Sequence, residues 1–278
     1  MSFAIDDLAS VLSHWSADQI GGLVDGDPVP TLPDSVAGWN LVGTTTTRPL
    51  YRPTSSIASL PAIEFDGTDD YLLSASRVLS GVNAPAVAIV CRVGTLKNYN
   101  SLLAITTSAA SPANGAATTR LTSRVYSTGN LLSAWSNGSL SGNFTAVGPV
   151  AVTTNYLIRF SYADISRVVA VNGLAYSTGT GANSNAGSVI NTTVYAHFGR
   201  ENLAGAFFGG LVAEIVLWDE TLLCESMYIE GELAHKYGLT LPTTHPFYAA
   251  APTTGPSSGG SSGVSQLING GLVRGQVI

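Results

Sequence analysis

The segment SMYIEGELAHKYGLTLPTTHPF, from Ser226 to Phe247, holds residues that could form a metal or catalytic site. Glu232 and His235 are three positions apart, which on a helix places a carboxylate and an imidazole on one face. Di-iron helical bundles use Glu-x-x-His pairs, but they need two such pairs and two further glutamates. The sequence contains no second Glu-x-x-His. We therefore interpret Glu232 and His235 as parts of a structural helix.

A second candidate is the turn FDGTDDY, which brings Asp66, Asp69 and Asp70 together. Three carboxylates in one turn offer the oxygen ligands that Ca²⁺ takes in proteins. The alternative is structural, with Asp66 and Asp69 accepting hydrogen bonds from turn amides in Asx-turns. We favour turn structure, and a calorimetric titration with Ca²⁺ that gives no heat would exclude the metal.

Glycoside hydrolysis would need two carboxyl groups, about 5–5.5 Å apart in a retaining enzyme. Some glucanases carry the pattern Glu-x-Asp-x-x-Glu on one strand, where the Glu-x-Asp pair shares a face because alternate residues do. The nearest segment, AEIVLWDE, has Glu214 but carries Val216 in place of the aspartate. The histidines His14 and His197 have no recognisable nucleophile to activate. We therefore predict no catalytic residues, no cofactor and no enzymatic activity.

Sugar binding is a further option, because aromatic rings on loops can form platforms for sugars. Trp15 and Trp218 lie in apolar runs and are expected in the core. The aromatic residues in or beside predicted loops are the candidates for glycan binding: Trp39, Tyr51, Tyr99, Trp135 and Tyr176.

The elements that would position these residues are mostly β-strands. Asn137-Gly138 and Asn172-Gly173 are dipeptides that two-residue hairpins prefer. Many strands with turn signals between them, and no strand–helix alternation, predict an antiparallel sandwich. The predicted strands are Ala86–Val93, Ser101–Thr107, Arg120–Tyr126, Leu131–Ser136, Tyr156–Tyr162, Ser166–Val171, Thr193–Gly199 and Gly210–Trp218.

Helical periodicity is convincing only between Asp219 and Tyr237. Gly238 suits the position that ends this helix, and Pro242 prevents it from restarting. A second, shorter helix is expected over Asp6 to Trp15. The buried face of the main helix is predicted to be Leu222, Ser226, Ile229, Leu233 and Tyr237.

Composition narrows the classes of function. Charged residues make up only 11% of the 278 residues and the net charge is -6, whereas nucleic-acid binding needs a basic surface. Nothing approaches the run of about eighteen apolar residues that a membrane helix needs. The N-terminus has two aspartates and no long apolar core, so we expect no signal peptide. Cys91 and Cys224 lie in apolar runs and are predicted to be buried thiols.

The composition changes near Ala249, where a linker rich in Pro, Gly and Ser begins. The chain ends in VSQLINGGLVRGQVI, an apolar segment that in extended form could add to the sheet edge of a partner. The residues predicted to anchor the chain to that partner are Val264, Leu267, Ile268, Leu272, Val273, Arg274, Val277 and Ile278.

Three segments carry a resemblance to a known family. They are HWSADQI…DGDPVPTLPDSVAGWNL, RPLYRPT…LPAIEFDGTDDYLLS and GGLVAEIVLWDETL…IEGELAHKYGLTLPTTHPF. Together they resemble the concanavalin A-like jelly rolls, specifically the laminin-G-like modules of bacterial and phage surface proteins. The resemblance spans roughly residues 10–248. It implies that the helix near the C-terminal end packs across the sandwich, and some relatives bind calcium.

We therefore predict an all-β, concanavalin A-like (laminin-G-like) antiparallel jelly-roll sandwich with one short helix near its C-terminal end and an extended C-terminal tail. The predicted parts are an N-terminal segment (1–20), the jelly roll (21–248), a linker (249–263) and an anchoring peptide (264–278).

For function, the resemblance implies a non-enzymatic structural virion protein, displayed on a bacteriophage as a capsid decoration, head-fibre or tail-associated protein. The alternative is a carbohydrate-binding adhesion module for host-surface glycans, and a glycoside hydrolase comes third. The expected partners are phage capsid or tail proteins, further copies of the chain and, for the alternative, host glycans, but neither nucleic acid nor membrane. The expected location is the virion surface, after synthesis in the host cytoplasm.

Overall fold

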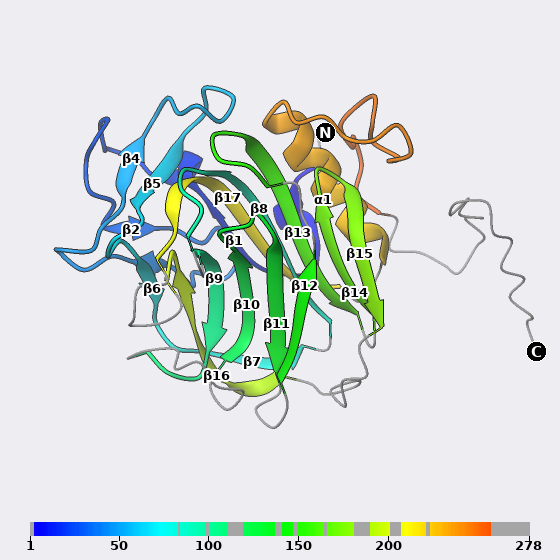
Figure 1. The fold of residues 1–278 in the computed structure, drawn as a ribbon, viewed down its shortest axis with the longest axis horizontal. Helices are drawn as coiled ribbons and strands as arrows, with labels where there is room; N and C mark the ends of the chain where they lie inside the picture. The colour runs from blue at the N-terminus through cyan, green and yellow to red at the C-terminus, as the bar shows by residue number, and fades with distance from the viewer. Residues whose placement is uncertain are drawn as a thin grey trace, which may run out of the picture.

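The computed structural model describes residues 3–82, 84–97, 100–109, 119–136, 141–146, 150–163, 166–180, 190–200, 207–220 and 223–256. These residues form two antiparallel sheets packed face to face, with the helix α1 (Leu223–Lys236) on the outer side of one sheet (Figure 1). The predicted all-β jelly-roll sandwich with one helix near its C-terminal end is therefore confirmed.

The sheet that carries α1, sheet A, has eight strands. Its central strand β17 pairs along one side with β8, and along the other side first with β5 and then with β1. In spatial order the strands are β15 (Leu174–Thr180), β14 (Ser166–Val171), β13 (Asn155–Ala163), β8 (Pro85–Val93), β17 (Gly209–Asp219), β5 (Ala62–Asp66) and β4 (Leu50–Arg52), with β1 (Val11–Ser16) beside β17.

The facing sheet, sheet B, has nine strands. Every strand predicted from the sequence is present in one of the two sheets, with ends shifted by a few residues, whereas most of the short strands were not predicted. The order in sheet B is β12 (Ser141–Ala146), β11 (Leu131–Ser136), β10 (Thr119–Val125), β9 (Asn100–Thr106), β16 (Ile190–Phe198), β6 (Leu72–Ser74), β3 (Leu41–Val42) and β2 (Thr31–Leu32), with β7 (Arg77–Val82) beside β16.

Strand alternation gives sheet A two buried faces. In β8, Ile89 and Cys91 enter the core between the sheets, while Ala86 and Ala88 face the helix. The small alanines let α1 approach the sheet closely, because side chains of successive strand residues point to opposite faces. Cys91 is a buried free thiol, as predicted.

The helix α1 begins at Leu223, later than predicted, because Asp219 is still the last residue of β17. Ile229 and Leu233 are fully buried against sheet A, as the periodicity indicated. Gly238 follows the helix with a φ of 61°, the left-handed conformation expected of a residue that ends a helix.

The N-terminal prediction was wrong. Instead of a helix over Asp6 to Trp15, a short 3-10 turn, η1 (Ile5–Asp7), is followed by the strand β1. The long strand β17 has β5 beside only its first half, so its second half needs another strand for its backbone hydrogen bonds. β1 fills that place and pairs with β17 in sheet A.

The hairpin between β14 and β15 turns at Asn172-Gly173, where both residues have positive φ, 49° and 75°. This is the geometry for which the dipeptide was identified. The other predicted hairpin dipeptide, Asn137-Gly138, lies outside the described residues.

No helix in the described part of the chain is long and apolar enough to cross a membrane.

Candidate functional site

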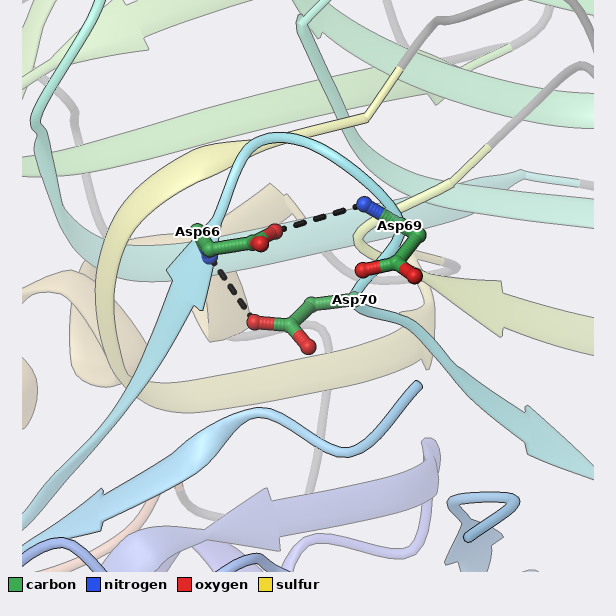
Figure 2. A group of neighbouring side chains, drawn as sticks. All are labelled: Asp66, Asp69 and Asp70. Carbon is green, nitrogen blue, oxygen red and sulfur yellow. Dashed lines mark hydrogen bonds between the residues drawn. The ribbon is translucent and has the colours of Figure 1, made fainter. Parts of the chain in front are cut away.

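The acidic turn between β5 and β6 brings three carboxylates together where the chain passes from sheet A to sheet B. Asp66, Asp69 and Asp70 each offer one oxygen within 4.8 Å of the others (Figure 2). Asp66 Oδ1 accepts hydrogen bonds from the backbone N–H groups of Thr68 (2.7 Å) and Asp69 (3.3 Å). Asp70 Oδ2 accepts the N–H of Asp66 at 2.9 Å. The predicted Asx-turn at Asp66 is therefore present, whereas the second carboxylate that bonds a turn amide is that of Asp70 and not, as predicted, that of Asp69.

The two bonded carboxylates of this turn differ in acidity. Burial opposes ionisation of Asp66, but backbone N–H donors led by Thr68 outweigh it and lower its pKa. Burial raises the pKa of Asp70 to about 6; the Asp66 amide opposes the change, and the negative charges of Asp66 and Asp69 add to it. Between about pH 4 and pH 6 the turn therefore carries less negative charge than three free aspartates would.

Two basic residues from other loops flank the turn. Lys97, after β8, donates from Nζ to the carbonyl of Gly67 at 2.8 Å. Arg200, after β16, places its guanidinium 4.4 Å from the ring centroid of Tyr71. We call the turn Asp66–Tyr71, together with Lys97 and Arg200, the polar rim.

A hard cation such as Ca²⁺ takes carboxylate oxygens, so the donor set fits such an ion. However, Asp66 and Asp70 already bond the amides of their own turn, which accounts for the cluster without a metal. Calcium binding at Asp66, Asp69 and Asp70 therefore stays a prediction.

Two of the aromatic candidates for glycan binding lie in the core. Trp39 is 4% exposed, donates from Nε1 to the carbonyl of Ala75 at 2.7 Å and packs on Trp15, while Tyr51 is 6% exposed. Neither presents a ring face to solvent, so both assignments were wrong. Tyr51 lies in β4 and not in a loop, and both rings belong to the core between the sheets.

The remaining predicted binding residues are not placed by the structure. Tyr99 lies outside the described residues, as do all the residues predicted to anchor the C-terminal peptide. Trp135 and Tyr176 belong to β11 and β15, but their side chains are not described.

The Glu-x-x-His pair has the structural role expected of it. His235 is exposed and donates from Nε2 to the carbonyl of Phe247 at 2.7 Å, which fastens the chain that follows the helix. His245 accepts the N–H of Phe247 at Nδ1, at 3.2 Å, within the same ordered turn. In the described part of the chain, Glu232 does not belong with either histidine to a group that could hold a metal ion.

Sequence reasoning missed a buried ionic cluster between sheet A and the C-terminal end of α1. At its centre Glu214, 2% exposed, accepts hydrogen bonds from His14 Nε2 (2.6 Å), Lys236 Nζ (2.5 Å) and Tyr237 OH (2.6 Å). Two aspartates complete the cluster nearer to solvent: Asp6 contacts His14 Nδ1 at 2.5 Å, and Asp18 contacts Lys236 Nζ at 2.6 Å.

A β-bulge aims Glu214 at this cluster. Val212 pairs with Cys91 and Glu214 with Val90, so Ala213 is an extra residue in β17. Without the bulge Glu214 would point into the apolar core between the sheets, because a one-residue shift reverses the side of every following side chain. The only signal in the sequence was a glutamate within an otherwise apolar strand.

The charged groups in this cluster stabilise one another in their ionised forms. Burial opposes ionisation of Glu214, but the hydrogen bond from His14 and the charge of Lys236 lower its pKa to about 2. Burial likewise lowers the pKa of His14, yet the bonds and charges of Glu214 and Asp6 raise it above the ordinary 6.5 overall. The cluster therefore fastens the N-terminal region and the end of α1 to sheet A.

A second ionic group holds the middle of α1. Arg159 of β13 donates from Nε to Glu230 Oε1 at 3.0 Å and lies 3.6 Å from Glu220 Oε1. Burial opposes the ionised form of Glu230, but the charge of Arg159 lowers its pKa.

These contacts also explain the acidic residues of the segment AEIVLWDE, in which the hydrolase pattern is incomplete. Glu214 and Glu220 are buried in ion pairs, and Asp219 Oδ1 accepts the N–H of Ala84 at 2.7 Å. His197 is buried in sheet B beside Thr106 Oγ1, at 3.1 Å, and burial lowers its pKa to about 4. In the described part of this segment no carboxyl pair is free to cleave a glycosidic bond.

No protein family and no curated protein sequence matches the chain. Among solved structures, it is similar to domain 4 of AbnA, a GH43 extracellular arabinanase from Geobacillus stearothermophilus, in complex with arabinotriose. The TM-score is 0.53 and the identity 15%, over 76% of this chain and 92% of that one.

Two binding domains of toxins are also similar. They are the receptor binding domain of botulinum neurotoxin type G (TM-score 0.52, 9% identity, 83% of this chain and 51% of that one) and the binding domain of Paraclostridial Mosquitocidal Protein 1 (0.53, 10%, 79% and 50%). The chain thus spans about half the length of these two. At such identities the similarity shows the fold alone, a jelly-roll-like β-sandwich.

Proposed function

We propose that this protein is a carbohydrate-binding module without enzymatic activity. The observation that carries the proposal is its similarity to nearly the whole of an arabinanase domain whose structure contains arabinotriose. The similarity to a receptor binding domain supports the same class of function. Fold alone does not fix function, so the proposal needs a direct binding test.

The acidic residues support the proposal that the protein does not cleave glycans. Glu214, Asp219 and Glu220 are each held by a structural partner, and a hydrolase would need two carboxyl groups facing one substrate. We expect no release of reducing sugar from a panel of polysaccharides, and release would overturn this part of the proposal.

We place the glycan on the polar rim. The exposed carboxylate of Asp69 can accept hydrogen bonds from sugar hydroxyls, and Tyr71 brings a half-buried aromatic ring to the same turn. Ordered loops on a rigid sandwich are common positions for binding residues.

The test is titration calorimetry of the full chain with arabino-oligosaccharides, preceded by a glycan array to find other ligands. Asp69→Asn should weaken binding about tenfold, because the sugar hydroxyl would bond a neutral amide oxygen in place of a charged carboxylate. Leu174→Ala, an exposed site in β15 at the opposite edge of sheet A, should leave affinity unchanged. Equal affinities for both variants would remove the polar rim as the site, and an array without any signal would remove glycan binding itself.

We also propose a virion role, which rests on the sequence resemblance over residues 10–248. In this proposal the chain is displayed on a bacteriophage surface and anchored to capsid or tail proteins through residues 264–278, in several copies. Mass spectrometry of purified particles should find the chain at a simple ratio to the major capsid protein. Absence from the particles would contradict the proposal without affecting glycan binding.

A further inference from the structure

The N-terminal strap, residues 3–10, lies across the helix side of sheet A. Phe3, Ile5 and Leu8 are buried in the second apolar core, which also contains residues of α1. The ring of Phe3 packs against Tyr228 of α1, with centroids 5.7 Å apart. In Figure 1 the N-terminus accordingly lies beside α1.

One side-chain ion pair fastens this strap. The Asp6 carboxylate contacts His14 Nδ1. Among the described residues, this is the side-chain contact that Asp6 makes. The opposite ring nitrogen of His14 contacts Glu214 Oε1 at 2.6 Å. The imidazole is therefore clamped between two carboxylates that belong to different elements.

The two carboxylates differ in what else holds them. Glu214 is 2% exposed and keeps Lys236 and Tyr237 as donors if His14 withdraws. Asp6 is 39% exposed and has water as its replacement partner. Only the imidazolium form has an N–H donor on each nitrogen, since neutral histidine has one donor and one lone pair.

We propose that protonated His14 is a latch that holds the N-terminal strap on the sandwich, and that loss of its proton releases Asp6 and loosens the strap. The neutral ring would turn a lone pair toward one carboxylate. Asp6 is the partner that leaves, because the exposed carboxylate is hydrated at little cost whereas Glu214 is buried.

The groups around His14 set the direction of this response. Acidic groups outnumber basic ones: carboxylates come from η1, from β17, from η2 (Ala17–Gln19) and from the loop after β2, whose Asp34 accepts the backbone N–H of His14 at 2.9 Å. The cations are Lys236 of α1 and Arg77 of β7, which donates to Ser13 Oγ at 3.0 Å, and Tyr237 is the remaining titratable group. Burial disfavours the imidazolium, but the hydrogen bonds and charges of Glu214 and Asp6 overcome it, so the pKa of His14 is raised above 6.5.

The latch therefore closes at low pH and opens at high pH. A group whose pKa is raised on folding stabilises the fold fully below its unfolded pKa, here 6.5, and loses that contribution as pH rises through the folded value. The response therefore lies above pH 6.5. Phe3 also lies beside Gly255, within the predicted linker, so a loosened strap frees that contact too.

The experiment is amide hydrogen exchange of the full chain between about pH 6 and about pH 9, corrected for intrinsic exchange. The reporters are the N–H groups of Asp7, Leu8 and Val11, which bond carbonyls within the strap. Their protection should fall about tenfold through the titration of His14, which NMR of the ring follows in the same samples. Global protection in β8 serves as the internal reference.

Two variants complete the test. His14→Gln should give low strap protection that does not change with pH. His235→Gln alters an exposed histidine that is far from the strap in the sequence, and this variant should behave as the native chain. If His14→Gln fails to fold, Asp6→Asn replaces it, with the same flat profile expected. Constant strap protection in the native chain, or an unchanged profile in Asp6→Asn, would overturn the latch.

Discussion

Glu214 is a charged residue inside the interface between a sheet and a helix, where removing an ion from water costs several kcal/mol. It is tolerated because His14, Lys236 and Tyr237 all donate to it. Glu214→Ala would leave the two cations without their buried partner. We expect the free energy of unfolding to fall by about 3–5 kcal/mol, measured by urea denaturation. Glu232→Ala, on the half-buried side of the same helix, should change it by about 0.5 kcal/mol or less, and equal effects would contradict the role of the cluster.

At Asp70 the pKa shift predicts that a substitution stabilises the fold, whereas the substitution of Glu214 destabilises it. The folded pKa of about 6 lies above the ordinary 3.8, so the fold favours protonated Asp70 and its ionisation costs stability as pH rises through about 6. Asp70→Asn keeps an oxygen that can accept the Asp66 N–H. The variant should therefore be more stable than the native chain at pH 7, by about 1 kcal/mol, with the difference shrinking below about pH 6. Thermal unfolding at several pH values checks this, and a variant that is less stable at every pH would show that the carboxylate is needed.

Single residues could be identified from the sequence where partners are close in the chain. The three aspartates of the acidic turn lie within five positions, so their clustering was predictable. His14 and Glu214 are two hundred positions apart, and their contact depends on β1 pairing with β17 and on the bulge at Ala213. Neither condition leaves a local pattern.

At the scale of elements, Gly199 shows how closely the turn after β16 approaches sheet A. Its φ is 80°, and an added Cβ would lie 2.5 Å from the ring of Phe65, which is packed against Phe198 and Phe208. Gly81 has nearly the same φ, 78°, but nothing within 4 Å of such a Cβ. Gly81→Ala should cost about 1 kcal/mol from backbone strain, and Gly199→Ala about 3–4 kcal/mol, since the clash adds to the strain. Denaturant unfolding of both variants measures the difference, and similar losses would mean that Phe65 moves aside.

Elements with a strong pattern of their own were predictable, and those that complete a neighbour were not. β8 and β13 are long apolar strands bounded by turns, and α1 has a clear apolar face. β1 was mistaken for a helix because its sequence, VLSHWS, places serines and histidine among apolar residues without strict alternation. Its strand conformation comes from the open edge of β17, which is a tertiary effect.

At the scale of the whole molecule, the two ends of the chain should contribute differently to stability. The strap supplies Phe3, Ile5 and Leu8 to a buried core, whereas the segment from Ser257 onward begins with a Gly- and Ser-rich linker, and its apolar end, residues 264–278, is predicted to bind a partner. Removal of residues 1–8 should lower the free energy of unfolding by about 3 kcal/mol or more, because burying each large apolar side chain stabilises by about 1.5–3 kcal/mol. Removal of residues 257–278 should leave it unchanged within about 0.5 kcal/mol. Urea denaturation of both shortened chains beside the full chain makes the comparison, with one cooperative transition expected in each case. A large loss on removing the C-terminal segment would mean that it packs on its own sandwich, and would leave it unsuited to anchor the module to a partner.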